Sequence, residues 1–181
     1  MSLQESLKKY AHLIVHAGCN LHKGQELYIS ARLEGAQLVR LVTEEAYRAG
    51  ASTVTVDWSD EKITRLRYEN EPLEAFEHCR KWRAELLNGI AKRGGIILSI
   101  LSDDPQALAG VDPRKLIAAR KANTAACRDF YDGMDFGRNA WCIVAAASPV
   151  WAKRVFPDSA GPAAYNRLWE AIFHAVRVDT P

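Results

Sequence analysis

The feature of this chain that most constrains its fold is a run of apolar residues from Gly95 to Leu101, Gly-Ile-Ile-Leu-Ser-Ile-Leu. The segment from Trp141 to Ala146 is apolar in the same continuous way. A strand that alternates in polarity buries one face, whereas a strand that is apolar throughout needs cover on both faces. These two runs therefore predict strands of a parallel sheet that lies between layers of helices.

Two more strands and several helices are expected around these runs. The strands are expected at Glu26–Ser30 and Thr53–Trp58, the second of which is rich in β-branched residues. Helical patterns alternate with the strands and cover residues 4–18, 35–49, 61–70, about 72–93, 113 to about 130, 149–155 and 165–176. The sequence therefore predicts one α/β domain over residues 1–181, with a doubly wound, mostly parallel sheet of four or five strands and helices on both faces.

The charge pattern argues against several classes of protein. The chain has 24 basic and 22 acidic side chains, a net charge of +2, and the two signs are interspersed. Because there is no block of like charge, we expect neither a nucleic-acid-binding surface nor a membrane-surface helix. We also find no secretory signal and no apolar run long enough to cross a membrane. Four scattered cysteines without a C-x-x-C motif favour a reducing cytoplasm: Cys19, Cys79, Cys127 and Cys142.

Carboxylates gather where the expected strands end. In an open parallel sheet, ligands bind beyond the carboxyl ends of the strands. Here those ends are residues 30–32, 57–60, 101–104 and 147–149. A group of carboxylates suits a hard cation or an amine. We favour the alternative that these residues cap helices, because Asp and Ser are also the preferred caps of helices that begin just after a strand.

The five histidines do not indicate a metal site. His12 and His16 have the i, i+4 spacing of the zinc ligands in H-E-x-x-H, but Leu13, Ile14 and Val15 between them leave no general-base glutamate. On a helical wheel both histidines lie opposite the Leu7/Ile14 stripe and near Glu5 and Lys9, so we expect them to face solvent without a native metal. The other three have no partner at ligand spacing and are expected as surface residues or as polar groups at helix ends: His22, His78 and His174.

Motifs for other chemistries are missing. The turn after the first strand has one glycine, Gly35, and neither G-x-G-x-x-G nor a Walker lysine, which disfavours dinucleotide and ATP binding. No serine lies in a G-x-S-x-G elbow. Cys19 and His22 precede the first strand in an expected turn and make a poor nucleophile–base pair. An aromatic group near the end of the chain, Trp151, Phe156 and Trp169, is expected to pack in the core, with an interface as the alternative.

Six short runs carry a resemblance to a known family. They occur in this order: Leu7-Lys8-Lys9-Tyr10-Ala11, Tyr47-Arg48-Ala49-Gly50-Ala51, Val56-Asp57-Trp58-Ser59-Asp60, Arg65-Leu66-Arg67-Tyr68-Glu69-Asn70, Trp151-Ala152-Lys153-Arg154-Val155-Phe156-Pro157 and Leu168-Trp169-Glu170-Ala171-Ile172-Phe173. Together they resemble the N-terminal domain of the thermophilic metalloaminopeptidase family, of the aminopeptidase T and aminopeptidase S type. The resemblance covers essentially the whole chain.

The resemblance implies a two-domain enzyme of about twice this length. It also implies a homodimer that removes N-terminal residues from peptides with two divalent metal ions (Zn, Co or Mn), and metal ligands that lie in the second domain. We therefore expect this chain to lack the catalytic domain and to contain no catalytic, cofactor-binding or metal-ligating residue. On this hypothesis it walls the substrate cavity or contributes to a dimer interface. The expected cavity or interdomain contacts are Asp57, Asp60, Arg65 and Tyr68.

Two alternatives to this hypothesis remain open at the level of sequence. The chain could be a non-catalytic module that folds alone and acts by association. It could also be an independent small-molecule binder that uses the acidic strand ends. Under all three hypotheses we expect no peptidase activity from the 181-residue chain with any metal.

Overall fold

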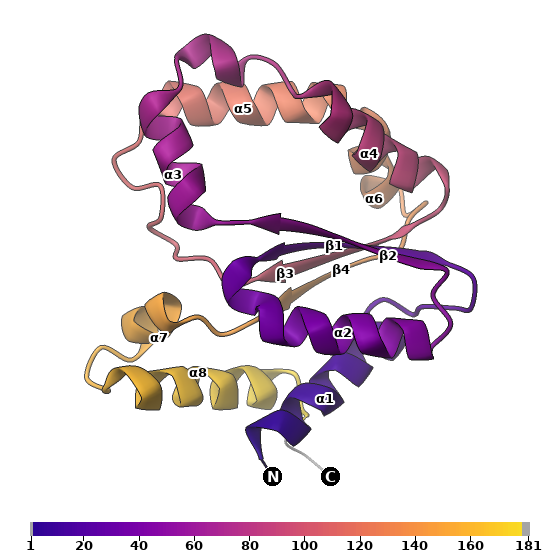
Figure 1. Ribbon diagram of the computed structural model, residues 1–181, viewed down its shortest axis with the longest axis vertical. Coiled ribbons are helices and arrows are strands. Elements are labelled where there is room, and N and C mark those ends of the chain that lie inside the picture. The colour runs from indigo at the N-terminus through magenta and orange to yellow at the C-terminus, as the bar shows by residue number, and fades with distance from the viewer. Residues whose placement is uncertain (1, 179–181) are drawn as a thin grey trace.

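The computed structural model describes residues 2–178, and their strands form one parallel sheet. The strands are β1 (Glu26–Arg32), β2 (Thr53–Ser59), β3 (Ile96–Leu101) and β4 (Trp141–Ala145), in the spatial order β2-β1-β3-β4 (Figure 1). From β1 the chain crosses to β2 on one side, and then to β3 on the other side. The sheet is therefore doubly wound, as the sequence predicted, and its topological switch point lies between β1 and β3.

Helices lie on both faces of the sheet, as expected (Figure 1). One layer contains α1 (Leu3–Leu13) with its π-helical continuation η1 (Ile14–Gly18), the turn η2 (Leu33–Gly35), α2 (Ala36–Arg48), α7 (Pro149–Val155) and α8 (Gly161–Ala175). The other contains α3 (Glu61–Asn70), η3 (Leu73–Phe76), α4 (Lys81–Lys92), α5 (Pro113–Ala126) and α6 (Arg128–Asp135). None of the described helices is long and apolar enough to span a bilayer.

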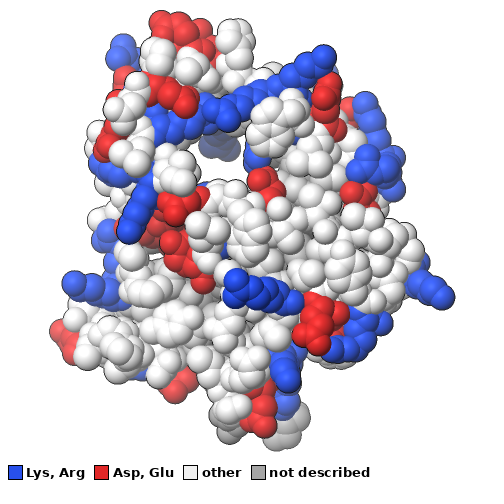
Figure 2. All heavy atoms as spheres, viewed as in Figure 1, with Lys and Arg blue, Asp and Glu red and all other residues white. Residues whose placement is uncertain are grey.

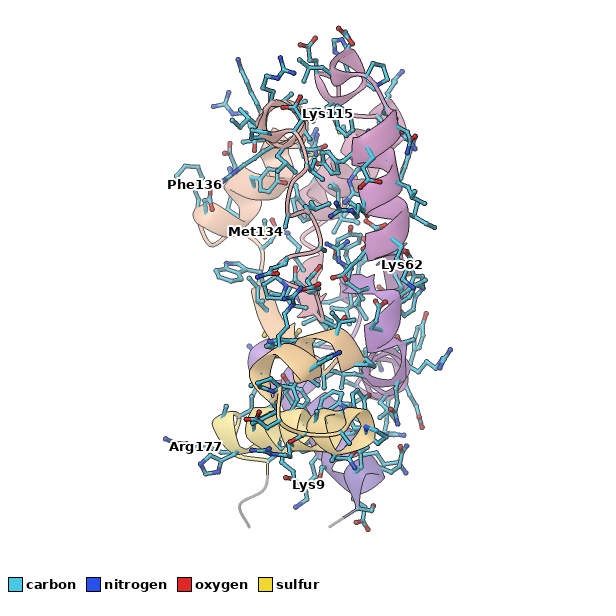
Figure 3. All side chains as sticks on the ribbon, turned by 90° about the vertical axis from the view of Figure 1, so that its left-hand side faces the viewer. Lys9, Lys62, Lys115, Met134, Phe136 and Arg177 are labelled. Atoms are coloured by element: carbon cyan, nitrogen blue, oxygen red, sulfur yellow. The ribbon has the colours of Figure 1, made fainter. Side chains whose placement is uncertain are left out.

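The two layers differ in how much they bury. The layer of α1, α2, α7 and α8 shares a large core with the sheet, in which Leu7, Leu38 and Leu98 have no exposed surface. In the other layer a smaller core forms where α4 and α6 meet the sheet, around Ile90 and Ile97. Helices α3 and α5 bury no residue and arch away from the strands (Figure 1). The side view shows the strands in the middle of the molecule, between the two layers (Figure 3).

The expectation that the run at Trp141–Ala146 is covered on both faces is wrong. Trp141 and Ile143 of β4 are 51% and 56% exposed. β4 is an edge strand, and α4 and α6 pack on the central strands at Tyr28 and Ile97 without reaching over Ile143. The run is apolar throughout, but only the face toward α1 and α8 is covered.

Two expected helices are divided in the structure. The helix expected from Pro113 to about Phe130 breaks at Cys127 and continues as α6. Asn88 of α4 satisfies the backbone at this break, because its Nδ2 donates to Ala126 O (2.8 Å) and its Oδ1 accepts from Phe130 N (3.2 Å). The pattern at 72–93 is also divided, into η3 and α4.

The aromatic group near the C-terminus lies in the core, as predicted. Trp169 is 2% exposed and stacks on Phe173 with ring centroids 5.3 Å apart. Trp151 and Phe156 are half-buried and pack against the same core. These residues hold α7 and α8 against the sheet, which fixes the layer opposite the strand-end cleft described below.

Candidate functional site

A cleft of about 670 Å³ lies at the carboxyl ends of β1, β2 and β3. Its floor includes Ser30 and Arg32 of β1 and Ser99 of β3, so it opens at the switch point of the sheet. That is where a doubly wound sheet leaves a crevice for ligands. Its walls come from α3, α5 and the segment that leads into α4, and Figure 2 shows the hollow with acidic and basic side chains around it.

Asp57 lies on one side of this cleft and is held by two donors. Tyr28 Oη donates to Asp57 Oδ2 at 2.7 Å, and Arg83 Nη1 donates to the same oxygen at 2.8 Å. Burial, together with the hydrogen bond to Asp57, raises the pKa of Tyr28 above its ordinary value. Burial alone would lower the pKa of Arg83, but the Asp57 charge and hydrogen bond raise it. The Arg83 guanidinium therefore stays charged and balances the charge of the carboxylate beside it.

Two other acidic residues at the strand ends, Asp103 and Asp104, also form ion pairs with arginines. Arg32 Nε donates to Asp103 Oδ1, and Arg32 Nη1 donates to Ser59 Oγ at 2.6 Å. Arg154 of α7 pairs with Asp104, which lowers the pKa of that carboxyl. These arginines neutralise the cluster of carboxylates that the sequence places here.

Helix capping, which the sequence analysis favoured, accounts for two of the strand-end residues. Asp60 caps α3 by accepting from Ile63 N at 2.9 Å. Ser148 caps α7 by accepting from Trp151 N at 3.2 Å. Both side chains thus have a local partner in the helix that they begin.

The residues of the cleft do not fit a divalent-metal site. A hard cation needs carboxylate oxygens that are free to face it. Asp57 and Asp103 each lie beside a guanidinium, that of Arg83 or of Arg32, and among the described residues of the cleft no three ligand-type side chains converge closely enough to hold an ion. The cleft walls instead combine guanidinium groups with aromatic side chains, including Trp58, Phe76 and Trp82. Such a lining suits a polar chain molecule with apolar groups.

The structure brings together two of the four residues predicted as cavity or interdomain contacts. Asp57 and Asp60 line the cleft, whereas Arg65 and Tyr68 do not. Arg65 Nη1 donates to Ala107 O (2.8 Å) and Ala109 O (3.1 Å), tying α3 to the loop before α5. The Tyr68 ring stacks on Phe76, with centroids 4.6 Å apart. As contacts to another domain, all four remain predictions.

Sequence reasoning missed the partners of Asp57. Arg83 lies 26 positions further along the chain, inside a helix, and nothing in its local pattern points to the cleft. Tyr28 has apolar neighbours on both sides in its strand, and its phenolic hydroxyl was the one sequence feature that pointed to a buried polar partner.

Outside the cleft, the structure places His12 and His16 at the surface, as predicted, but with an unexpected partner. His12 Nδ1 and His16 Nε2 lie 2.8 and 2.9 Å from the same atom, Glu45 Oε1 of α2. Glu5, which the helical wheel placed near them, accepts from Ser2 in a capping box instead. Hydrogen bonding by His12 is the main cause of the lowered pKa of Glu45. His22, His78 and His174 are exposed, as predicted, and His78 lines the cleft.

Comparison with known proteins identifies the family. The thermophilic metalloprotease (M29) family matches residues 3–181. The chain belongs to this family. It is 37% identical over 178 residues to Aminopeptidase AmpS of Bacillus subtilis, covering 98% of this chain and 43% of that protein. It is 38% identical over 178 residues to Aminopeptidase T of Thermus thermophilus, covering 98% of this chain and 44% of that protein.

A solved structure of a relative has the same fold. Wild-type AmpT from Thermus thermophilus matches with a TM-score of 0.87 and 37% sequence identity, covering 95% of this chain and 43% of that chain. This agreement confirms the resemblance to aminopeptidases T and S and the predicted α/β fold. The chain spans less than half the length of the relatives that it matches.

Proposed function

We propose that this chain is the N-terminal domain of a metal-dependent aminopeptidase, in which it is non-catalytic and forms one wall of the substrate cavity. The observation that carries the proposal is the match of 95% of this chain to 43% of AmpT at a TM-score of 0.87. The two divalent ions of the whole enzyme would then be held by another domain. The carboxylates of the cleft are paired with arginines, which supports the placement of the metal ions in another domain.

The cleft supplies a wall with suitable chemistry for peptides. Its guanidinium groups can donate to peptide carbonyls, and its aromatic rings can pack against substrate side chains. On this view Asp57 and Arg83 maintain the shape of the wall, while Trp58 and Trp82, 40% and 55% exposed, are available for contact.

A chimera tests the proposal. The purified 181-residue chain is expected to release no p-nitroaniline from leucyl-p-nitroanilide with Co²⁺, Mn²⁺ or Zn²⁺. A chimera in which this chain replaces the matching segment of Thermus thermophilus Aminopeptidase T is expected to hydrolyse it. In that chimera Trp82→Ala should raise KM for peptides more than it lowers kcat. Metal-dependent turnover by the chain alone, or a folded, metal-loaded chimera without activity, would contradict the proposal.

The exposed apolar side chains of α3 suit a contact with another domain. Ile63 and Leu66 are 67% and 57% exposed. Apolar groups gathered on a helix that buries no residue are typical of a surface that is covered by a partner. We therefore expect Ile63→Ser with Leu66→Ser to reduce concentration-dependent self-association of the isolated chain, measured by light scattering. Lys81→Ser, which changes a 90% exposed side chain on α4, is the matched control. Equal self-association in all three proteins would argue against a docking role for α3.

The homodimer and the cytoplasmic location belong to the same proposal. Four cysteines without a disulfide framework are in keeping with a reducing compartment. Fractionation of cells that produce the natural protein tests the location, and sedimentation of the chimera tests the dimer.

A further inference from the structure

The one group of described residues that could hold a metal ion lies away from the cleft, where α1 and η1 pack on α2. His12, His16 and Glu45 each present one ligand atom, and these three atoms lie within 4.8 Å of one another. The two imidazole rings face each other with centroids 4.2 Å apart. Two imidazoles and one carboxylate thus converge from two helices on one small volume.

The local backbone explains why the two histidines align so closely. His12 belongs to the α-helix and His16 to the π-helical turn η1, in which Cys19 N donates to Ile14 O at 2.7 Å. A π-turn is wider than an α-turn, so each residue turns the chain by a smaller angle. The side chains at i and i+4 therefore come nearer to the same azimuth. Single π-turns inside helices occur frequently at functional sites.

Glu45 is held in place as a ligand would need to be. Its side chain is 12% exposed, while those of His12 and His16 are 66% and 41% exposed. Arg48 donates to its other oxygen, Oε2, and also pairs with Glu44 at 2.8 Å. Ligating carboxylates commonly have such an outer partner, which fixes their orientation. The group Glu44–Arg48–Glu45 carries a net negative charge, which attracts a cation.

These observations point to a binding site for a divalent transition-metal ion. We propose that His12, His16 and Glu45 bind Zn²⁺, or an ion of the same class such as Ni²⁺ or Co²⁺, through Nδ1, Nε2 and Oε1. Imidazole suits these metals, and two histidines with a glutamate form a known zinc donor set that leaves further positions open to solvent.

The change of geometry that binding requires is small. At metal–ligand distances of about 2.1 Å, tetrahedral ligand atoms lie about 3.4 Å apart. The present separations from Glu45 Oε1 are 2.8 and 2.9 Å. Opening them by about half an ångström needs only small rotations of exposed imidazoles, and the ion takes the place of the two hydrogen bonds. It then links α1 to α2, and binding stabilises the folded chain.

Titration of the tag-free chain with ZnCl₂ and with NiCl₂ tests the site. We expect one ion per chain by calorimetry, and a rise in the midpoint of thermal unfolding. His12→Gln and His16→Gln should each weaken binding by about tenfold or more, and the double variant should lose the thermal shift. His22→Gln removes an exposed imidazole elsewhere and should bind like wild type. Thiol binding by the four cysteines would persist in every variant, so it cannot mimic this pattern.

A second measurement uses the unmodified chain. In nuclear magnetic resonance spectra, the imidazole signals of two of the five histidines should move or broaden with sub-stoichiometric metal. The proposal is overturned if the double variant binds as tightly as wild type, or if no histidine signal responds to metal. It does not depend on the proposed peptidase role, because its readouts require no activity.

Discussion

Asp57 illustrates how single contacts set the chemistry of the cleft. It lies at the end of β2, where an open carboxylate would favour a cation. Asp57 Oδ2 instead accepts hydrogen bonds from Tyr28 and Arg83, and the Asp57 side chain is 20% exposed. A partly buried carboxylate with two donors is a structural anchor between the sheet and α4.

The anchor can be tested by removing the guanidinium. Arg83→Met leaves a partly buried carboxylate with one donor, and we expect it to lower the free energy of unfolding by about 1–3 kcal/mol. Urea denaturation measures the change. Arg114→Met is the control, because that side chain is 75% exposed beside Asp112 and its loss should leave the stability almost unchanged. Equal losses in the two variants would show that the Asp57 pair is an ordinary surface contact.

Glu61 makes the stability depend on pH. Burial, followed by the charges of Asp103 and Glu34, raises the pKa of its carboxyl above 4.5, although Asp104 N donates to it. The folded state therefore binds this proton more tightly than the unfolded state does. Protonation of Glu61 therefore contributes to the free energy of unfolding below pH 4.5, and this contribution is lost as the pH rises through the raised pKa of the folded state.

Replacing the Glu61 carboxyl by an amide removes the cost of placing an ionised carboxylate at this partly buried position. Glu61→Gln keeps an acceptor for Asp104 N and is expected to raise the free energy of unfolding at pH 7, by less than about 1 kcal/mol because solvent screens the group. The gain should disappear at pH 4, as judged by urea titrations at both pH values. Glu85→Gln, at a site 66% exposed, should change little at either pH. A less stable Glu61→Gln protein at pH 7 would contradict this account.

At the scale of elements, the helix boundaries depend on contacts between distant segments. The break at Cys127 exists because Asn88 accepts one freed backbone N–H and donates to one freed carbonyl. The periodicity of residues 113–130 continues through the break, so the local pattern predicted a single helix.

The break gives a prediction for Asn88. Asn88→Ala leaves both backbone groups without their partner, and we expect a loss of about 1–3 kcal/mol in the free energy of unfolding. The matched control is Asn70→Ala, whose amide donates to Leu66 O at an exposed position and should change stability by about 0.5 kcal/mol or less. The comparison fails if thermal and urea unfolding give the two variants the same stability.

At the scale of the whole molecule, the two layers are unequal. The layer of α1, α2 and α8 shares the main core, which includes Trp169 and Phe173. The arch of α3 and α5 buries no residue of either helix, and the two helices are joined to each other by contacts such as the one between Lys115 Nζ and Tyr68 O at 2.6 Å. Among the described residues, only Phe76 of the turn η3 is buried between them, where it stacks on Tyr68. Helices that bury so little apolar surface open at a low free energy.

Hydrogen exchange should report this difference. We expect backbone amides of α3 and α5 in the isolated chain to exchange much faster than those of α1, α2 and α8, because local opening of the arch exposes little apolar surface. Mass spectrometry of peptic fragments measures the rates. In the chimera described above, exchange in α3 should slow if another domain covers Ile63 and Leu66. Equal exchange rates in both layers of the isolated chain would contradict the prediction that α3 and α5 open more easily.

The sequence by itself determined the class of fold, the order of the elements and most of the strand ends. It placed Asp57 and Asp60 at the right edge, because strand periodicity and helix starts are local signals that each segment carries alone. The family resemblance was equally accessible, because it depends on short runs in a fixed order.

Only the tertiary structure decided which side chains meet. Arg83 reaches Asp57 because α4 packs on the central strands of the sheet, and Glu45 joins His12 and His16 because α2 packs beside α1. It also decided that one face of β4 stays open, although the strand is apolar throughout. Local periodicity predicts which side of a segment is apolar and therefore buried. Which partner buries it depends on the packing of all elements at once, and no single segment carries that information.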